Sequence, residues 1–152
     1  TLERDQPVEH DGYELLFVGT ELISAKDEAY DFGVGDGFVG VIIEVRRDGE
    51  LVDTLRPGML RFISPSGAIN SRSEVDRMTG LTGDTIVILD ILQSNDLLSS
   101  MMREEVGGAE DVETVRVIVH SLRGSHLVWA GWVLVMLGGA LALASSDRSA
   151  EH

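Results

Sequence analysis

Histidine is the residue type in this chain that could bind a metal or a cofactor, because the chain has four histidines and no cysteine. No two of them have the HxxxH spacing of a helical metal site, so the sequence predicts no zinc or copper centre. His126 is the one candidate for cofactor binding, since an imidazole just before an apolar run could ligate a heme iron or bind a partner. The alternative, a polar side chain among lipid headgroups, is favoured. The other histidines are His10, His120 and His152.

Residues 30–37 hold two aspartates and three glycines, which are residue types of calcium and phosphate loops. Their spacing is not that of a GxGxxG loop or an EF-hand, and no basic residue follows to neutralise a phosphate. The serines lack a G-x-S-x-G elbow. Neighbouring carboxylates such as Glu104 and Glu105 are typical of a solvated acidic surface rather than of an acid and base pair. The sequence therefore predicts no catalytic residue and no metal site.

The charge of the chain is strongly negative. Asp and Glu number 26 against 12 for Lys and Arg, the formal net charge is −14, and Lys26 is the single lysine. A carboxylate-dense surface nearly free of lysine predicts a halophilic host, because such a surface stays hydrated where salt screens charge repulsion. The same balance argues against nucleic acid as a partner, since only Arg46 and Arg47 are adjacent and no basic patch is present.

An uncharged run near the C-terminus predicts one transmembrane helix. Residues 127–146 carry no charged side chain, and at ~1.5 Å per residue they reach about 30 Å, the thickness of the hydrocarbon core of a bilayer. Trp129 and Trp132 stand at the start of the run, where indole rings favour the headgroup boundary, so both are predicted to be interface anchors. We assign residues 123–147 to the membrane helix and residues 148–152 to a short polar tail.

Small residues recur on one side of this predicted helix. Gly131, Gly138 and Ala142 are separated by seven and four positions, which places them on one face where another helix could approach closely. The pattern favours a packed partner helix. A lone anchor stays open as the alternative, because glycine is generally more frequent in membrane helices than in soluble ones.

Residues 1–122 have the period-two pattern and the β-branched composition of strands rather than the pattern of helices. The stretches with this pattern are residues 12–18, 38–45, 59–63, 85–92 and 112–120. Short strands separated by turn signals, without a long amphipathic helix, predict a mainly β domain, either an antiparallel sandwich or a barrel.

Turn residues indicate how these strands connect. Asp48-Gly49 lies between two apolar runs and predicts a tight hairpin, because both residues tolerate a positive φ. Pro57-Gly58 predicts a break in the return strand, and residues 64–73 are expected to form a loop. Residues 95–108 are expected to form a loop or a short helix.

The chain begins at Thr1 without an initiator methionine, and we expect it to be a segment of a longer protein. No basic stretch followed by an apolar run precedes the strands, so export is expected to depend on another part of that parent. The residues leave open whether the chain is a fragment or a stand-alone subunit.

Several short motifs occur in a fixed order along the chain. They are Gly12-Tyr13 at the opening strand, Asp48-Gly49 with Leu55-Arg56-Pro57-Gly58 at the hairpin, Ser73-Glu74-Val75, the strands at residues 84–89 and 115–120, and the run from His126 through Trp129, Trp132 and Met136-Leu137-Gly138-Gly139 to Asp147-Arg148. In this order they resemble the C-terminal region of the CcmF family of cytochrome c-type biogenesis proteins, a heme lyase family that includes NrfE. His126 departs from this pattern, since the family commonly has proline there, and Ala130 stands in place of isoleucine.

The resemblance implies a C-terminal segment of a membrane-bound cytochrome c maturation component that helps to deliver and attach heme to apocytochrome c. It implies a location in the cell membrane, with the β domain extracytoplasmic and the C-terminus cytoplasmic. The implied partners are the upstream transmembrane helices of the parent, the heme chaperone CcmE, a CcmH-like subunit and apocytochrome c. A salt-adapted archaeal relative would account for the departures from the family pattern.

Heme is implied as a cofactor of the full-length parent and is not expected in this segment alone. The tryptophan-rich heme-handling segment and the membrane histidines of the family lie upstream, so no heme-ligating residue carries over. The family takes part in heme attachment, but this segment has no recognisable catalytic residues, and whether it contributes enzymatic activity is left open. The alternative function is a membrane-tethered extracytoplasmic β domain that acts as a scaffold or a small-ligand binding module.

Overall fold

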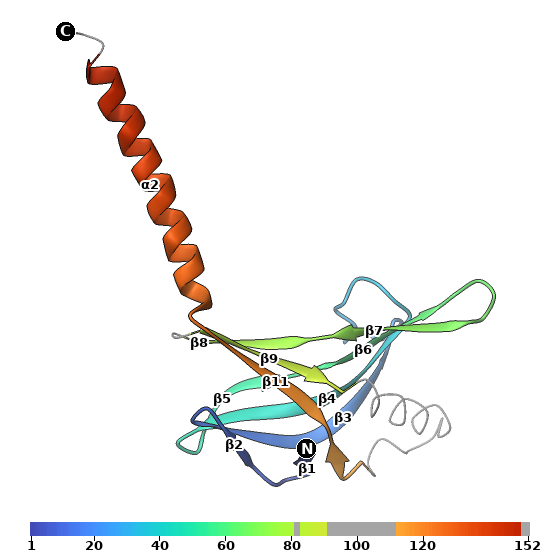
Figure 1. Ribbon diagram of the computed structural model, residues 1–152. Coiled ribbons are helices and arrows are strands. Elements are labelled where there is room, and N and C mark those ends of the chain that lie inside the picture. Colours follow the sequence, from blue (N-terminus) through green and yellow to red (C-terminus); the bar gives the residue numbers. More distant parts are fainter. Residues whose placement is uncertain (81–82, 91–111, 150–152) are drawn as a thin grey trace. The chain divides into compact units, whose positions relative to one another are not determined.

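The computed structural model describes residues 1–80, 83–90 and 112–149 (Figure 1). Antiparallel strands dominate the described residues before Gly124, and one long apolar helix follows. The predicted fold class, a mainly β antiparallel domain with a C-terminal helix long enough to span a membrane, is confirmed. The helix or loop expected at residues 95–108 lies outside the described residues.

The described strands vary from short bridging pieces to long strands of the main sheet. In chain order they are β1 (Leu2–Glu3), β2 (Val8–His10), β3 (Tyr13–Ser24), β4 (Gly37–Arg47), β5 (Glu50–Leu55), β6 (Gly58–Ile63), β7 (Ile69–Glu74), β8 (Asp76–Gly80), β9 (Gly83–Leu89), β10 (Thr114–Val115) and β11 (Val117–Arg123). The contacts divide the chain into two compact units, one formed by Thr1–Met78 with Ile86–His120 and the other by Thr79–Thr85 with Ser121–His152.

The main sheet of the first unit is built around β4. Its strand order is β2-β3-β4-β6-β7, and β5 also pairs with β4. β3 runs antiparallel along one edge of β4, while β5 and β6 share the other edge. Val41, Ile43 and Val45 are completely buried on β4, so this strand has the apolar run expected of a strand that is covered by other elements.

Pro57 explains why the strand beside β4 is divided in two. Ile43 pairs with Leu55 and Gly40 pairs with Gly58, so the register is the same on both sides of the interruption. At the position between them Val41 N–H donates to Pro57 O at 3.1 Å, but proline has no N–H to donate in return. The expected break at Pro57-Gly58 is confirmed, and it removes a hydrogen bond without shifting the sheet.

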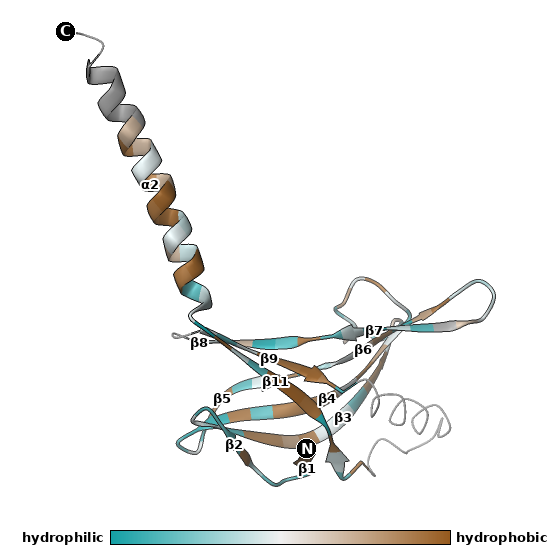
Figure 2. Ribbon diagram, viewed as in Figure 1, coloured by the Kyte–Doolittle hydropathy of each residue, from teal (hydrophilic) through white to brown (hydrophobic). Residues whose placement is uncertain are grey.

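Two apolar clusters lie on opposite faces of the main sheet. The larger cluster joins residues of β3, β4 and β5, such as Phe17 and Ile43, to Leu2 of β1, Val87 of β9 and Val115 of β10. The smaller one joins Ile23, Phe38 and Leu60, which the register places side by side. Figure 2 shows the apolar residues along β3 and β4. The protein therefore has a layered β core, as the alternating pattern requires.

The turns follow the local sequence closely. Asp48 and Gly49 both have a positive φ, 52° and 81°, so the predicted hairpin between β4 and β5 is confirmed. Asp11 and Gly12 adopt the same conformation, with φ of 51° and 77°, between β2 and β3. This second Asp-Gly turn was not predicted from the sequence, although the dipeptide is the same and favours a two-residue hairpin for the same reason.

The prediction of a loop at residues 64–73 is wrong for the second half of this segment. β7 occupies Ile69–Glu74 and pairs with β6 from Ile63 opposite Ile69 to Gly58 opposite Glu74. The sequence of this strand, INSRSE, lacks the apolar alternation that predicts a strand. Backbone hydrogen bonds to the buried neighbour β6 hold such an edge strand in place despite its low β-propensity.

Strands far apart in the sequence close the β domain. β1 pairs antiparallel with β10, and Leu2 lies opposite Val115. Both side chains are buried in the larger cluster, at 3% and 1% exposure. The domain core is therefore complete only when its first and last strands have come together.

Gly58 is the position where the main sheet leaves least room for a side chain. A Cβ at Gly58 would lie 2.4 Å from Val39 O and 2.5 Å from Cζ of Phe38. We predict that Gly58→Ala lowers the free energy of unfolding by about 1–3 kcal/mol, since overpacking forces neighbours from their rotamers. Gly19→Ala on β3 is the matched control, because a Cβ there meets nothing within 4 Å. Thermal unfolding followed by circular dichroism in micelles measures both, and equal stability of the two variants would contradict the packing.

Candidate functional site

The sequence-predicted functional residues lie in or beside α2, the helix Ser125–Ser149. The helix begins two residues later than expected because Gly124, with φ of 80°, turns the chain from β11 into the helix. Leu127 N–H donates to Gly124 O at 2.9 Å in the first turn. Residues Ser125–Ala142 have a mean hydropathy of 1.6 and none of this stretch is buried. By length and composition, α2 could therefore cross a membrane.

The two tryptophans lie on the exposed surface near the start of α2. Trp129 is 73% exposed and Trp132 is 64% exposed. In water such exposure of large apolar rings is unfavourable, whereas at a membrane boundary the ring body is covered by lipid and the indole N–H stays among polar groups. Their position suits the interface-anchor role that the sequence predicts for them.

The small residues of α2 leave an open surface. A Cβ built at Gly131 or at Gly138 would meet nothing within 4 Å, and Ala142 is exposed. Because no side chain stands above these glycines, a second helix could approach the backbone of α2 closely there. The predicted packing face is thus accessible in this chain, and the partner helix that would cover it stays a prediction.

His126 lies at the start of α2 and contacts another part of the same unit. Its Nε2 is 2.6 Å from the carbonyl oxygen of Gly80 at the end of β8. A carbonyl oxygen can only accept, so Nε2 must carry the proton and donate. Held in this way, the imidazole has only Nδ1 left for another ligand. The sequence singled out His126 as a cofactor ligand or a headgroup residue, and it gave no sign of this contact across 46 positions.

The glycine-rich segment of residues 30–37 is fastened to the sheet by its own side chains. Asp36 Oδ2 accepts a hydrogen bond from Ile63 N–H at 2.6 Å, and Asp36 N–H donates to Arg61 O at 2.7 Å. Phe32 stacks on Phe38 with ring centroids 4.3 Å apart. The segment therefore covers the smaller apolar cluster. In the described part of the chain no three His, Asp or Glu side chains are grouped as they would be around a metal ion.

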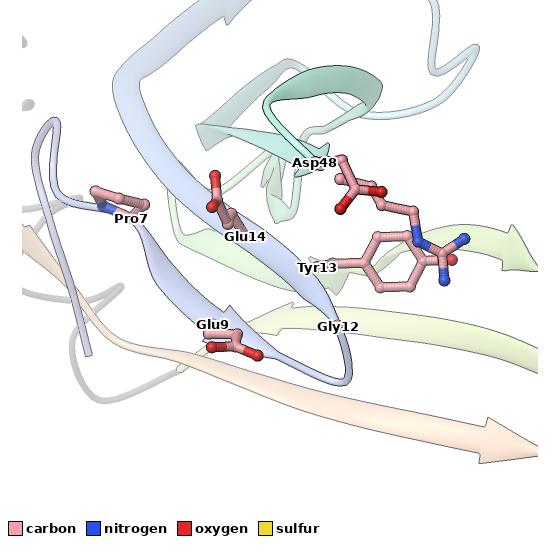
Figure 3. Close-up of a pocket in the computed structure, with 7 residues that line it drawn as sticks. Pro7, Glu9, Gly12, Tyr13, Glu14 and Asp48 are labelled. Atoms are coloured by element: carbon pink, nitrogen blue, oxygen red, sulfur yellow. The ribbon is translucent and has the colours of Figure 1, made fainter.

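One pocket lies where the two Asp-Gly turns come close together (Figure 3). It has a volume of about 430 Å³ and is lined by Pro7, Glu9, Gly12, Tyr13, Glu14, Arg47 and Asp48. The carboxylates of Glu9, Glu14 and Asp48 outnumber the one guanidinium, that of Arg47. The Arg47 guanidinium lies 4.7 Å from the centre of the Tyr13 ring. Such a lining attracts cations more than anions. Sequence reasoning missed this pocket, because its residues come from two hairpins whose proximity is set by the sheet.

Arg56 forms polar contacts with two other strands of the β domain. Its Nε and Nη2 donate to the two carboxylate oxygens of Glu21 at 2.8 and 2.7 Å, and its backbone N–H donates to Asp76 Oδ2 at 2.7 Å. The hydrogen bonds to Glu21 are the main cause that raises the pKa of the Arg56 guanidinium. A guanidinium held in this fork stays charged and fixed in place. Its role is to tie the interrupted strand β5–β6 to β3 and β8.

Tryptophan fluorescence tests the membrane position of α2, because both tryptophans of the chain lie in it. We predict that Trp132→Phe, which leaves Trp129, is quenched most by lipids brominated near the carbonyl groups. Trp129→Phe leaves Trp132, which lies three residues, or about 4.5 Å, further along the helix, and its best quencher should be brominated deeper in the chain. The two variants are each other's control. Quenching of both by aqueous iodide in vesicles would contradict insertion.

No protein-family model, no curated protein and no solved structure matches this chain. The comparisons therefore neither support nor exclude any function. The features that bear on function are the order of the motifs, the β domain with its ion pair and pocket, and the apolar helix that follows β11.

Proposed function

We propose that this chain is the C-terminal part of a membrane-bound cytochrome c maturation component of the CcmF type. In this proposal α2 is its last membrane helix. The β domain stands outside the cytoplasm and supports the attachment of heme to apocytochrome c. The observation that carries the proposal is the direct passage from β11 into an apolar helix that begins with His126, Trp129 and Trp132 and continues with Met136 and two glycines.

The remaining motifs support the proposal through the places that they occupy in the fold. Gly12 ends the first hairpin turn, Asp48-Gly49 forms the second, and Leu55 to Gly58 forms the interruption beside β4. These are positions where backbone conformation restricts the choice of residue. Motifs at such positions are those that a shared β domain would retain, so they favour a common fold more than a shared chemistry.

His126, the candidate heme ligand of this segment, already uses one ring nitrogen in a contact within the protein. Its Nε2–H donates to Gly80 O at 2.6 Å, so Nδ1 is the only ring nitrogen whose lone pair could ligate an iron. The resemblance carries over no heme-ligating residue, and we assign no step of heme transfer to a residue of this chain. Its proposed part is to hold a β surface at the membrane where the heme-bearing helices of the parent and the apocytochrome meet.

The proposal extends to the host and the location. The excess of 26 acidic over 12 basic residues supports a salt-adapted, halophilic host, because carboxylates hold water in concentrated salt. The extracytoplasmic position of the β domain rests on the family resemblance. Basic residues contribute little to it, since Arg148 follows the apolar run while Arg116 and Arg123 precede it.

A scaffold or small-ligand module tethered to the membrane is the second candidate. The pocket of about 430 Å³ between the two Asp-Gly turns favours ligand binding within that alternative. Both functions require the same anchor and β domain. They differ in whether c-type cytochromes depend on this chain.

Heme staining of membrane proteins tests the proposed function in the host organism. We predict that deleting residues 1–122 while keeping α2 removes most covalently bound heme from c-type cytochromes. The b-type cytochromes, which bind heme without covalent attachment, should keep their absorbance and serve as the internal control. Reintroduction of the full chain should restore the stained bands. Unchanged c-type cytochromes in the deletion strain would refute the proposal and favour the tethered module.

A reporter fused after His152 tests the orientation. We predict that a reporter active only in the cytoplasm is active in this fusion, because the proposal places the C-terminus there. A reporter active only after export should be inactive at the same position and active when fused before Thr1. Immunoblots must show equal amounts of each fusion. The opposite pattern would reverse the assigned orientation.

A further inference from the structure

The compact unit that contains α2 also contains the end of β8, the start of β9 and the end of β11. It is formed by Thr79–Thr85 and Ser121–His152. We call its part outside the apolar run, residues 79–80, 83–85 and 121–126, the junction. The junction and α2 pack together in one unit. The ends of these strands therefore lie close to the start of α2.

Two polar contacts join the junction to the first residues of α2. His126 Nε2 donates to Gly80 O at 2.6 Å, and Ser125 Oγ donates to Asp84 Oδ2 at 3.5 Å. The Asp84 carboxylate thus lies at the helix N-terminus, where the helix dipole favours negative charge. Both contacts come from β8 and β9, which are distant from α2 in the sequence. The start of the helix is therefore held by the ends of two strands, β8 and β9.

Gly83 brings two backbones of the junction into direct contact. A Cβ at this position would lie 2.2 Å from Leu122 O and 2.9 Å from Cα of Arg123. Its φ of 148° is also one that other residues rarely adopt. Any larger residue would force the start of β9 away from the end of β11. Glycine at position 83 therefore keeps the β8–β9 end close to the beginning of α2.

The depth of the junction in the membrane follows from the thickness of the headgroup layer. The apolar run begins at Leu127, and Arg123 precedes it by four residues, which is about 6 Å along a helix and about 13 Å in an extended chain. A headgroup layer is about 5–8 Å thick on each side of the hydrocarbon core. His126 is thus within this layer if α2 spans the membrane, and Gly80, in contact with His126, lies at the same level.

We propose that the junction is a lipid-contact surface that binds the phosphodiester headgroups of the bilayer crossed by α2. This inference rests on the membrane anchor of the proposed function. The side chains it presents are those of Thr79, Leu122, Arg123 and His126, all exposed. Arginine and threonine donate hydrogen bonds to phosphate oxygens, and the 45% exposed Leu122 adds apolar area at the boundary. The occupant is continuous with the lipid around α2, so no separate partner is required.

Site-directed spin labelling tests this surface, because the chain has no native cysteine. Thr79→Cys places a nitroxide on the end of β8, and Val135→Cys places one in the middle of α2. The full chain is reconstituted in phosphatidylcholine nanodiscs, and the access of each label to oxygen and to a water-soluble nickel complex is measured. We expect the label at position 135 to lie in the hydrocarbon. The label at position 79 should lie at phosphate depth, with several-fold lower nickel access than in micelles stripped of lipid.

Two further variants separate the junction from the anchor. Gly83→Ala should raise the nickel access of the label at position 79 while the label at position 135 stays deep. Gly139→Ala is the matched control, since a Cβ there meets nothing within 4 Å and the residue lies outside the predicted packing face, and it should change neither label. His126→Ala removes the bond to Gly80 without adding volume and should shift the label at position 79 in the same direction by less.

The outcomes distinguish the two proposals. A fully water-accessible label at position 79 together with a deep label at position 135 overturns the lipid-contact surface and leaves the anchor intact. A water-accessible label at position 135 overturns both. An unchanged label at position 79 in the Gly83→Ala variant shows that close backbone packing does not set the depth of the junction, and it also overturns the inference.

Discussion

The backbone hydrogen bonds of β4 are the constraint on which the rest of the β domain depends. β3 uses one edge of this strand and β5 with β6 uses the other, so three strands take their register from β4. A slip by one residue would turn Val41 and Ile43, now fully buried, to the opposite face. The two apolar clusters on either side of the sheet make such a slip costly. The register brings the two Asp-Gly turns together beside the pocket and places Arg56 beside Glu21 and Asp76.

Local chemistry decided which elements could be predicted from the sequence. Asp48-Gly49, Pro57-Gly58 and the uncharged run of α2 act within a few residues of themselves, and each forms the expected element. The polar strand β7 was not predicted because its stability comes from the neighbour it pairs with. The predicted ends of strands were also imprecise. β3 continues to Ser24 and β11 to Arg123, because tertiary partners extend both strands beyond their own apolar pattern.

The candidate site also has a part that could be predicted from the sequence and a part that could not. Composition and spacing were sufficient to single out His126, the two tryptophans and the small residues of α2. They could not identify Gly80 or Asp84 as neighbours of the helix start, because those contacts join positions 46 and 41 residues apart. Gly83 is the clearest case: one glycine in a strand pattern suggests a bulge or a close approach, but only the fold identifies the backbone of Leu122 and Arg123 as what it approaches.

The pairing of β1 with β10 also sets the order of events when the chain is made. Leu2 cannot find Val115 until nearly all of the β domain has been synthesised, and only β11 then separates Val115 from the helix. Contacts this distant in the sequence form slowly, because the intervening chain must first be ordered. Closure of the β core and synthesis of α2 therefore fall close together in time. Until both are complete, the open face of the sheet needs protection from other chains.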